Sequence, residues 1–314
     1  MGESLFFDVA ILTLGVLALF GGAELLVKGA GRLALGLGLR AATVGVTVVA
    51  FATTAPELFV AILAAIDVSS AVGLGTVVGS NIANIGLVLG IAALIRPLTI
   101  SDTVMRRHVP FMLFTAILLP ILAIDGRLGR LEGVILLAVL VAFTLYLLYY
   151  VNVDPASAPR EVASSDEVTP MDVAFVVVGL IALVAGSRWL VSGGSSILLA
   201  MDVPEFVVGL TVLAIGTSLP ELAASVMGAL RGETGFAIGN VVGSNIYNIV
   251  AVLGILAIAV PITVSPSVIR FELPLVVVFT IALVAMMGYG RRLSRLDGLG
   301  LVAGYAVFMW LLFA

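Results

Sequence analysis

Long runs of apolar residues with few charges are the feature that most restricts how this chain can fold. Ten such runs can be read along the sequence, near residues 5–27, 41–66, 71–95, 109–125, 131–151, 171–191, 205–230, 235–260, 270–288 and 297–313. A helix needs about 20 mostly apolar residues to cross a bilayer, whereas barrel strands alternate apolar and polar residues. The runs therefore predict an all-α polytopic membrane protein with ten transmembrane helices.

The composition agrees with a membrane location and excludes several classes of function. Apolar residues make up 61% of the chain and charged residues only 11%. The chain has no cysteine, which excludes disulfides, thiolate metal sites and cysteine nucleophiles. It also lacks the dense basic stretch that would suggest nucleic-acid binding.

The second half of the chain repeats the first at an offset of 164 residues. Identical residues at corresponding positions include Gly22 and Gly186, Pro56 and Pro220, Glu57 and Glu221, and the GSNI segments 79–82 and 243–246. Because each copy holds an odd number of spans, the second copy must enter the membrane from the opposite side. We therefore predict two inverted five-helix repeats, over 1–151 and 171–314, joined by a Pro/Ser/acid-rich linker at 152–170.

The distribution of basic residues favours one orientation in a plasma or inner membrane. The 15 lysines and arginines divide 11 to 4 between the two sets of alternating connections. Because basic loops stay in the cytoplasm, both termini are predicted outside and the central linker inside.

Two apolar runs are interrupted by nearly the same polar residues, in FATTAPELFV at 51–60 and IGTSLPELAA at 215–224. Glu57 and Glu221 lie well inside their spans, where insertion scales put the cost of an ionised side chain at about 2.5–3.5 kcal/mol. Neither run contains a lysine or arginine to neutralise the carboxylate. Mobile cations or protons are therefore the expected partners of these two glutamates.

The neighbouring residues are rich in oxygen. Pro56 and Pro220 each remove a helical N–H, which frees backbone carbonyls and favours a break in the helix. Hydroxyl groups lie within one turn of the glutamates, on Thr53, Thr54, Thr217 and Ser218. An oxygen shell without sulfur or nitrogen donors suits hard cations such as Na⁺ and Ca²⁺. A single proline or threonine in a membrane helix is more often a kink or a back-bonded hydroxyl, but the paired recurrence favours an ion site.

The following span in each half adds hydroxyl and amide groups on one helical face. Ser80 precedes Asn84 by four residues, and Ser244 precedes Asn248 by four, so each pair is predicted to share a face. Asn81 and Asn245 lie about 100 degrees from that face on a helix of 3.6 residues per turn. We expect these two asparagines to hydrogen-bond the helix backbone.

The two duplicated stretches resemble the alpha-repeats of the cation/Ca²⁺ exchanger superfamily, and within it the prokaryotic Na⁺/Ca²⁺ exchangers. The resemblance rests on FATTAPELFV with GTVVGSNIANIGLVLG, inside 43–97, and on AIGTSLPELAASV with GNVVGSNIYNIVAVLG, inside 207–261. It implies ten helices in two inverted halves, ion sites at mid-membrane, and alternating access by sliding of the first and sixth spans.

The resemblance also implies a role for each site residue. Glu57 and Glu221 would be the central ligands shared by Ca²⁺ and Na⁺. Hydroxyl oxygens would come from Thr54, Ser80, Ser218 and Ser244. Mainly backbone carbonyls would come from Thr53, Thr217, Ala50 and Ala214, and Asn84 and Asn248 would face the central site. Some relatives carry Asp at the position of Asn248, so the two-carboxylate site of this chain argues against K⁺ co-transport.

Together, these features predict a secondary active antiporter that exchanges Na⁺ for Ca²⁺, without enzymatic activity or a cofactor, and that functions as a monomer in the lipid bilayer. A Ca²⁺/H⁺ antiporter is the nearest alternative, but the proton-coupled relatives usually carry GNxxE where this chain has TSxPE. A cation channel fits less well because an inverted repeat is less expected there. An intramembrane hydrolase fits least, because no recognisable nucleophile accompanies the carboxylates.

Overall fold

The computed structural model describes residues 2–36, 43, 45–67, 70–153, 169–200, 216 and 218–313. The α-helices are α1 (Gly2–Gly36), α3 (Ala50–Asp67), α4 (Ser70–Ala83), α5 (Gly90–Ile95), α6 (Val109–Leu122), α7 (Arg130–Val153), α8 (Pro170–Ala200), α11 (Leu219–Arg231), α12 (Thr234–Tyr247), α13 (Gly254–Ala259), α14 (Pro266–Arg270), α15 (Glu272–Gly288) and α16 (Arg295–Phe313). Short π-helical segments are η1 (Gly45–Val49), η2 (Asn84–Leu89), η3 (Val104–His108) and η5 (Asn248–Leu253). Two-residue strands are β1 (Leu98–Thr99), β2 (Arg127–Leu128), β3 (Ile262–Thr263) and β4 (Arg292–Leu293).

Eight helical stretches within the described residues are long and apolar enough to cross a membrane. They are Phe7–Leu33, Gly73–Ile95, Val104–Leu122, Arg130–Leu147, Pro170–Trp189, Thr234–Ala259, Pro266–Gly288 and Arg295–Leu312. The prediction of an all-helical, multi-pass membrane protein is confirmed. The two other predicted spans, 41–66 and 205–230, are the ones that carry the glutamates, and α3 and α11 occupy much of their described portions.

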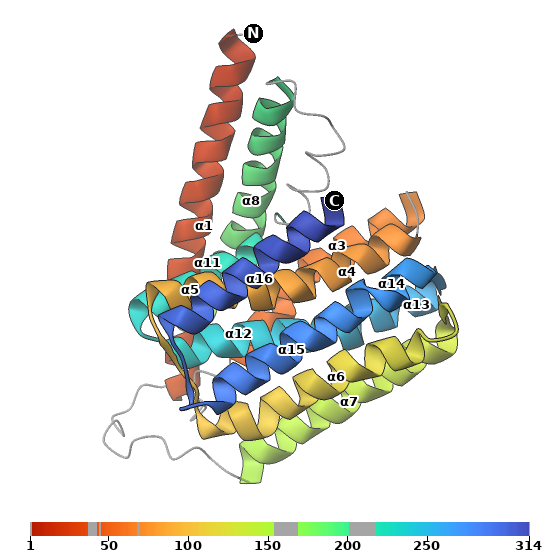
Figure 1. Cartoon of the computed structure of the whole chain (residues 1–314). Coiled ribbons are helices and arrows are strands. Elements are labelled where there is room, and N and C mark those ends of the chain that lie inside the picture. Colours follow the sequence, from red (N-terminus) through yellow and green to blue (C-terminus); the bar gives the residue numbers. More distant parts are fainter. Residues whose placement is uncertain are drawn as a thin grey trace.

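Helices α1 and α8 form a long antiparallel pair that crosses the other helices steeply (Figure 1). Glycines allow this close approach. A Cβ atom on Gly22 would lie 2.9 Å from the carbonyl oxygen of Gly179, and one on Gly186 would lie 2.9 Å from that of Gly15. Small residues at such crossings let membrane helices pack backbone to backbone. The two contacts are equivalent, because an offset of 164 converts Gly15 and Gly22 into Gly179 and Gly186.

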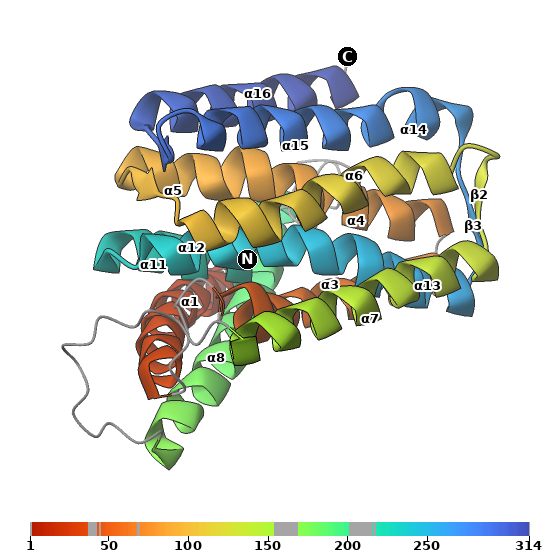
Figure 2. The ribbon, with the colours of Figure 1, turned by 90° about the horizontal axis from the view of Figure 1, so that it is seen from below.

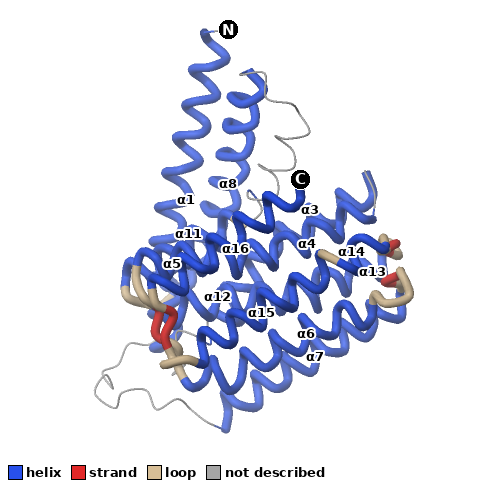
Figure 3. Tube along the Cα trace, in the orientation of Figure 1, coloured by secondary structure: helices blue, strands red, loops and turns tan. Residues whose placement is uncertain are grey.

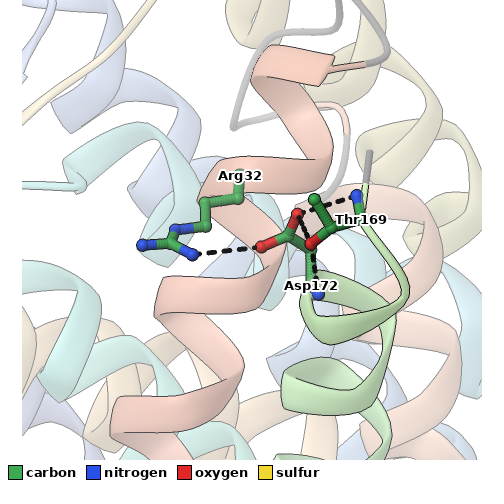
Figure 4. Close-up of polar contacts among 3 residues, drawn as sticks. All are labelled: Arg32, Thr169 and Asp172. Atoms are coloured by element: carbon green, nitrogen blue, oxygen red, sulfur yellow. Dashed lines mark hydrogen bonds and ion pairs between the residues drawn. The ribbon is translucent and has the colours of Figure 1, made fainter. Parts of the chain in front are cut away.

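Polar contacts fix one end of the α1–α8 pair (Figure 4). Asp172 accepts hydrogen bonds from the backbone N–H and the hydroxyl of Thr169, at 3.0 and 2.6 Å, and so caps the start of α8. Its other carboxylate oxygen lies 3.4 Å from Nη1 of Arg32 on α1. A second ion pair joins Glu24 of α1 to Arg231 at the end of α11.

The remaining helices lie in layers, with α15 and α16 on one side and α3 and α7 on the other (Figure 2). Helix α12 runs between these layers, and every residue from Phe236 to Tyr247 is buried. A helix with no exposed face in this stretch is surrounded by protein, so polar groups on it can face other helices and not lipid.

Two short β-ribbons join the halves of the chain at opposite ends of the molecule (Figure 3). Strand β1 pairs antiparallel with β4, with Thr99 opposite Arg292, and β2 pairs antiparallel with β3, with Arg127 opposite Thr263. An offset of 164 residues converts β1 into β3, and an offset of 165 converts β2 into β4. Each ribbon therefore contains one strand from each half, and the two pairings are the same pairing with the halves exchanged.

Candidate cation site

Four helices that carry the sequence-predicted ligands meet inside the bundle. Helix α3 contacts α4, α11 and α12, while α12 also contacts α4 and α11. Helices α3 and α4 belong to the first half of the chain and α11 and α12 to the second. The site is thus built from equivalent elements of both halves.

The two glutamates occupy the centre of this arrangement. Glu57 on α3 and Glu221 in the first turn of α11 are both 0% exposed, and their carboxyl groups are close enough to interact electrostatically. In the part of the chain that the structure describes, no third His, Asp or Glu joins them in a metal-binding group, and no ion pair includes either glutamate. The site offers two formal negative charges without a visible cationic side chain.

Many polar atoms around the glutamates lack a hydrogen-bond partner within the described residues. Both carboxylate oxygens of Glu57 and Oε2 of Glu221 are unpaired. The same holds for the buried hydroxyls of Thr54, Ser80 and Ser218 and for both side-chain amide atoms of Asn84 and Asn248. A buried polar group without a partner costs about 1–3 kcal/mol. The concentration of these atoms on contacting helical segments of both halves therefore indicates a site for a ligand that is coordinated by oxygen.

The four asparagines of the two GSN segments differ in their hydrogen bonds, and equivalent residues of the two halves behave alike. Asn81 donates to the carbonyl of Val77 at 2.9 Å, and Asn245 donates to that of Val241 at the same distance. Their predicted role as backbone-bonding groups is confirmed. Asn84 and Asn248, by contrast, make no such bond with any described residue, and each begins a π-helical segment, η2 or η5. Single π-helical turns inside α-helices are frequent at functional sites.

The predicted helix break at Pro56 is wrong, because α3 is continuous from Ala50 to Asp67. Proline removes only one backbone donor. Breaking the other backbone hydrogen bonds in a membrane, where no water replaces them, would cost more free energy than keeping the helix intact. The irregularity lies earlier, in the π-helical segment η1 that precedes Ala50. In the second half, Pro220 is instead the second residue of α11, where its missing N–H removes no helical bond.

The remaining predicted ligands are only partly covered by the structure. Ser244 is 0% exposed, and its hydroxyl lies 3.5 Å from Oε1 of Glu221. Thr53 and Ala50 are also 0% exposed, and the Thr53 hydroxyl lies 3.1 Å from the carbonyl oxygen of Val49 and 3.3 Å from that of Ala50. Thr217 and Ala214 lie outside the described residues.

Sequence reasoning missed two polar residues beside the site, Asn240 and Ser225. Asn240 on α12 is 0% exposed and contacts Thr53, Ser225 and the backbone of Glu221. An amide inside an apolar run was the available signal, but its partners lie on other helices and could not be read from one span.

Comparison with known proteins identifies the family of the chain. Residues 7–149 and 171–314 match the family model of the sodium/calcium exchanger protein. The chain is 34% identical over 308 residues to the putative antiporter CaxA of Alkalimonas amylolytica, covering 96% of this chain and 97% of CaxA. It is 30% identical over 347 residues to the sodium/calcium exchanger MaX1 of Methanosarcina acetivorans, covering 96% of this chain and 97% of MaX1.

Solved structures of a sodium-calcium exchanger have a similar fold. The sodium-calcium exchanger NCX_Mj, soaked with 10 mM Na⁺ and no Ca²⁺, superposes with a TM-score of 0.85 at 28% identity, over 97% of this chain and 98% of that one. NCX_Mj soaked with 2.5 mM Na⁺ and 10 mM Sr²⁺ gives a TM-score of 0.84 at 29% identity, with the same coverage. The chain belongs to the sodium/calcium exchanger protein family, within the cation/Ca²⁺ exchanger superfamily.

Proposed function

We propose that this protein exchanges Na⁺ for Ca²⁺ across the membrane by alternating access. The observation that carries the proposal is the set of unpaired oxygens around Glu57 and Glu221, buried on contacting helical segments of both halves. Carboxylate, hydroxyl and amide oxygens are the ligands that hard cations prefer. The cation is therefore the transported substrate, and the unpaired atoms are the groups that would receive it.

Charge explains why the two ions would be coupled. Two buried carboxylates are neutralised either by one Ca²⁺ or by two Na⁺, and leaving them without a cation is costly in a low-dielectric interior. Both ions would use the same oxygens and so exclude each other. Competition for one site is what couples a flux of Na⁺ in one direction to a flux of Ca²⁺ in the other.

The proposed roles of the site residues follow their chemistry. Glu57 and Glu221 bind through carboxylate oxygens. Hydroxyl ligands are Thr54, Ser80, Ser218 and Ser244, and amide oxygens come from Asn84 and Asn248. Backbone carbonyls come from Ala50, Ala214, Thr53 and Thr217. The contacts of the Thr53 hydroxyl with its own helix favour a carbonyl role for this residue.

Relatives support Na⁺ and Ca²⁺ as the substrates. MaX1 and NCX_Mj are both named sodium/calcium exchangers, and NCX_Mj has been studied with Na⁺, Ca²⁺ and Sr²⁺. Ca²⁺ tolerates six to eight oxygens in a flexible shell, whereas Mg²⁺ demands a tight octahedron. The wide set of candidate oxygens here favours Ca²⁺ as the divalent ion.

We propose ten transmembrane helices in two inverted repeats, over 1–151 and 171–314, with the segment 152–170 as a linker. The equivalent ribbons at opposite ends of the molecule and the equivalent glycine contacts of α1 and α8 support an exchange of the halves by a two-fold axis. Inverted repeats are related by a two-fold axis of this kind that lies in the membrane plane. The spans that contain α3 and α11 would complete the ten.

The arginines support an orientation with both termini outside. The set with 11 basic residues includes Arg292 in strand β4 and three arginines close to the β1–β4 ribbon: Arg96, Arg291 and Arg295. The set with four includes Arg127 in strand β2 and Arg130 just after it, at the ribbon on the opposite end. We propose that the protein works as a monomer, with the α1–α8 pair sliding across the ion-binding helices.

Transport by purified protein in vesicles tests the proposal. Vesicles loaded with Na⁺ should accumulate Ca²⁺ when diluted into Na⁺-free buffer, and uptake should stop when the internal Na⁺ is replaced by K⁺. If uptake survives Na⁺ removal and instead follows a pH gradient, the protein is a Ca²⁺/H⁺ antiporter and Na⁺ coupling is wrong.

A further inference from the structure

Asn240 is the one fully buried amide near the site whose side chain reaches three different partners among the described residues. Its Nδ2 donates to the hydroxyl of Ser225 at 3.1 Å and to the backbone carbonyl of Glu221 at 3.4 Å. Its Oδ1 lies 3.4 Å from the hydroxyl of Thr53, which is also 3.1 and 3.3 Å from the carbonyl oxygens of Val49 and Ala50. The side chain on α12 therefore connects α11 of the second half with α3 of the first half.

The contacts of the Asn240 amide with protein distinguish this residue from the proposed ligands. Asn84 and Asn248 have both amide atoms unpaired within the described residues, as expected for side chains that bind a cation when it is present. Asn240 uses its oxygen and its nitrogen in contacts with protein. An amide that contacts both helices in this way can hold their polar groups in place.

The partners of Asn240 lie directly beside the two charges. Thr53 is one helical turn before Glu57 on α3, and the carbonyl that accepts from Nδ2 belongs to Glu221 itself. A single side chain thus bridges the backbone segments that carry both carboxylates. The separation of these segments decides whether one ion can touch both carboxylates at once.

We propose that Asn240 is a positioning residue that sets the spacing of Glu57 and Glu221 and thereby favours Ca²⁺ over Na⁺. This inference rests on the proposed function. A divalent ion needs both carboxylates together, so its binding depends on the spacing of α3 and α11. Each Na⁺ needs only one carboxylate and neutral oxygens, so Na⁺ binding tolerates a change in spacing.

The sequence repeat does not supply the same set of bonds in the first half. The positions equivalent to Asn240 and Ser225 in the first half are Thr76 and Ala61. Alanine has no hydroxyl, so the first half cannot form the same set of bonds. The bridge is therefore an asymmetric addition to an otherwise repeated site.

Asn240→Ala tests the inference through two measurements, Ca²⁺-induced thermal stabilisation of the purified protein and Na⁺-driven Ca²⁺ uptake in vesicles. Outer partners of metal ligands typically contribute about 10–100-fold to metal affinity. We expect the half-saturating Ca²⁺ concentration to rise about tenfold in both measurements, with a clearly smaller change in the Na⁺ dependence. Equal changes for the two ions, or none, would overturn the inference.

A double-mutant cycle separates positioning from general loss of packing. Thr53→Val keeps the shape and the carbonyl of Thr53 but removes the hydroxyl, with its contact to Asn240 and its contacts to the Val49 and Ala50 carbonyls. The part of its effect that passes through Asn240 should not add to that of Asn240→Ala. Thr280→Val is the matched control, because the Thr280 hydroxyl bonds only the Val276 carbonyl of its own helix in the described contacts. Its effect should add to that of Asn240→Ala, and non-additivity there would contradict the bridge.

Two further outcomes keep the inference testable. If Asn240→Ala does not fold, Ser225→Ala replaces it, because this variant removes the hydroxyl that accepts from Asn240. It should raise the half-saturating Ca²⁺ concentration by a smaller factor. An unchanged value in folded Ser225→Ala would overturn the inference. If wild-type vesicles show no Na⁺-driven uptake, the proposed function fails, whereas the Ca²⁺-induced thermal stabilisation still decides the role of Asn240.

Discussion

The two halves of this protein are alike in their scaffold and unlike around their glutamates. The ribbons and the glycine contacts of α1 and α8 convert into one another when the halves are exchanged. The glutamates do not: both oxygens of Glu57 are unpaired among the described residues, whereas Glu221 has Ser244 beside one oxygen and Asn240 on its backbone. Duplication thus explains the scaffold and most of the site residues, and divergence of a few polar residues explains the asymmetry around the glutamates.

The largest expected effect comes from removing either charge. Glu57→Gln and Glu221→Gln should each reduce exchange below detection, because one remaining carboxylate cannot neutralise Ca²⁺ in a buried site. Uptake of Ca²⁺ by vesicles measures the effect, and gel filtration shows whether the variant is folded. Glu132→Gln is the control, since this carboxylate accepts from the Gly129 N–H at the start of α7. Near wild-type uptake by either site variant would contradict the equal need for both halves.

The second effect tests the equivalence of the scaffold. Gly22→Ala and Gly186→Ala place a Cβ within 2.9 Å of opposing backbone atoms, and overpacking of this kind costs about 1–3 kcal/mol. Thermal unfolding in detergent should show a similar loss for both. Gly21→Ala is a matched control, because a Cβ there would meet nothing within 4 Å. A large loss for only one of the two variants would break the equivalence.

A third test concerns the asparagines that begin η2 and η5. Asn84→Asp and Asn248→Asp each add a negative charge with little change of shape, so Ca²⁺ binding should tighten. A gain of about 1.4 kcal/mol would lower the half-saturating Ca²⁺ concentration about tenfold. Both variants should move in the same direction in a Ca²⁺ titration. Opposite shifts would show that the amides are not equivalent.

The smallest effect comes from the ion pair at one end of α1 and α8. The position equivalent to Arg32 in the second half is Ser196, so this pair has no repeated copy. Arg32→Gln should cost less than about 1 kcal/mol, because the Arg32 side chain is 54% exposed and water screens the charge. Asp172→Asn should cost more in the same thermal unfolding assay, because it also weakens the cap of α8. The reverse order would rule out the capping role.

Much of the site could be predicted because its residues stand out against an apolar background. Glu57 and Glu221 are costly inside a membrane, and Ser80 with Asn84 follows helical periodicity. The continuity of α3 through Pro56 could not be predicted, because it depends on backbone bonds kept in a medium without water. The bridge from Asn240 could not be predicted either, since its partners lie 187 and 15 residues away on other helices.

Some features of the fold could be predicted from the sequence and others could not. Apolar runs and the 164-residue offset predict membrane helices and equivalent halves. The pairing of β1 with β4, and not with its own half, arises from how the halves pack. Two-residue strands carry too little sequence pattern to be found without that packing.

The most direct test is a titration of the purified protein with Ca²⁺ at increasing Na⁺ concentrations, with K⁺ holding the ionic strength constant. If Glu57 and Glu221 form one site for which the two ions compete, the apparent Kd for Ca²⁺ rises steadily with Na⁺. An apparent Kd that Na⁺ leaves unchanged would contradict a shared site and, with it, the proposed coupling.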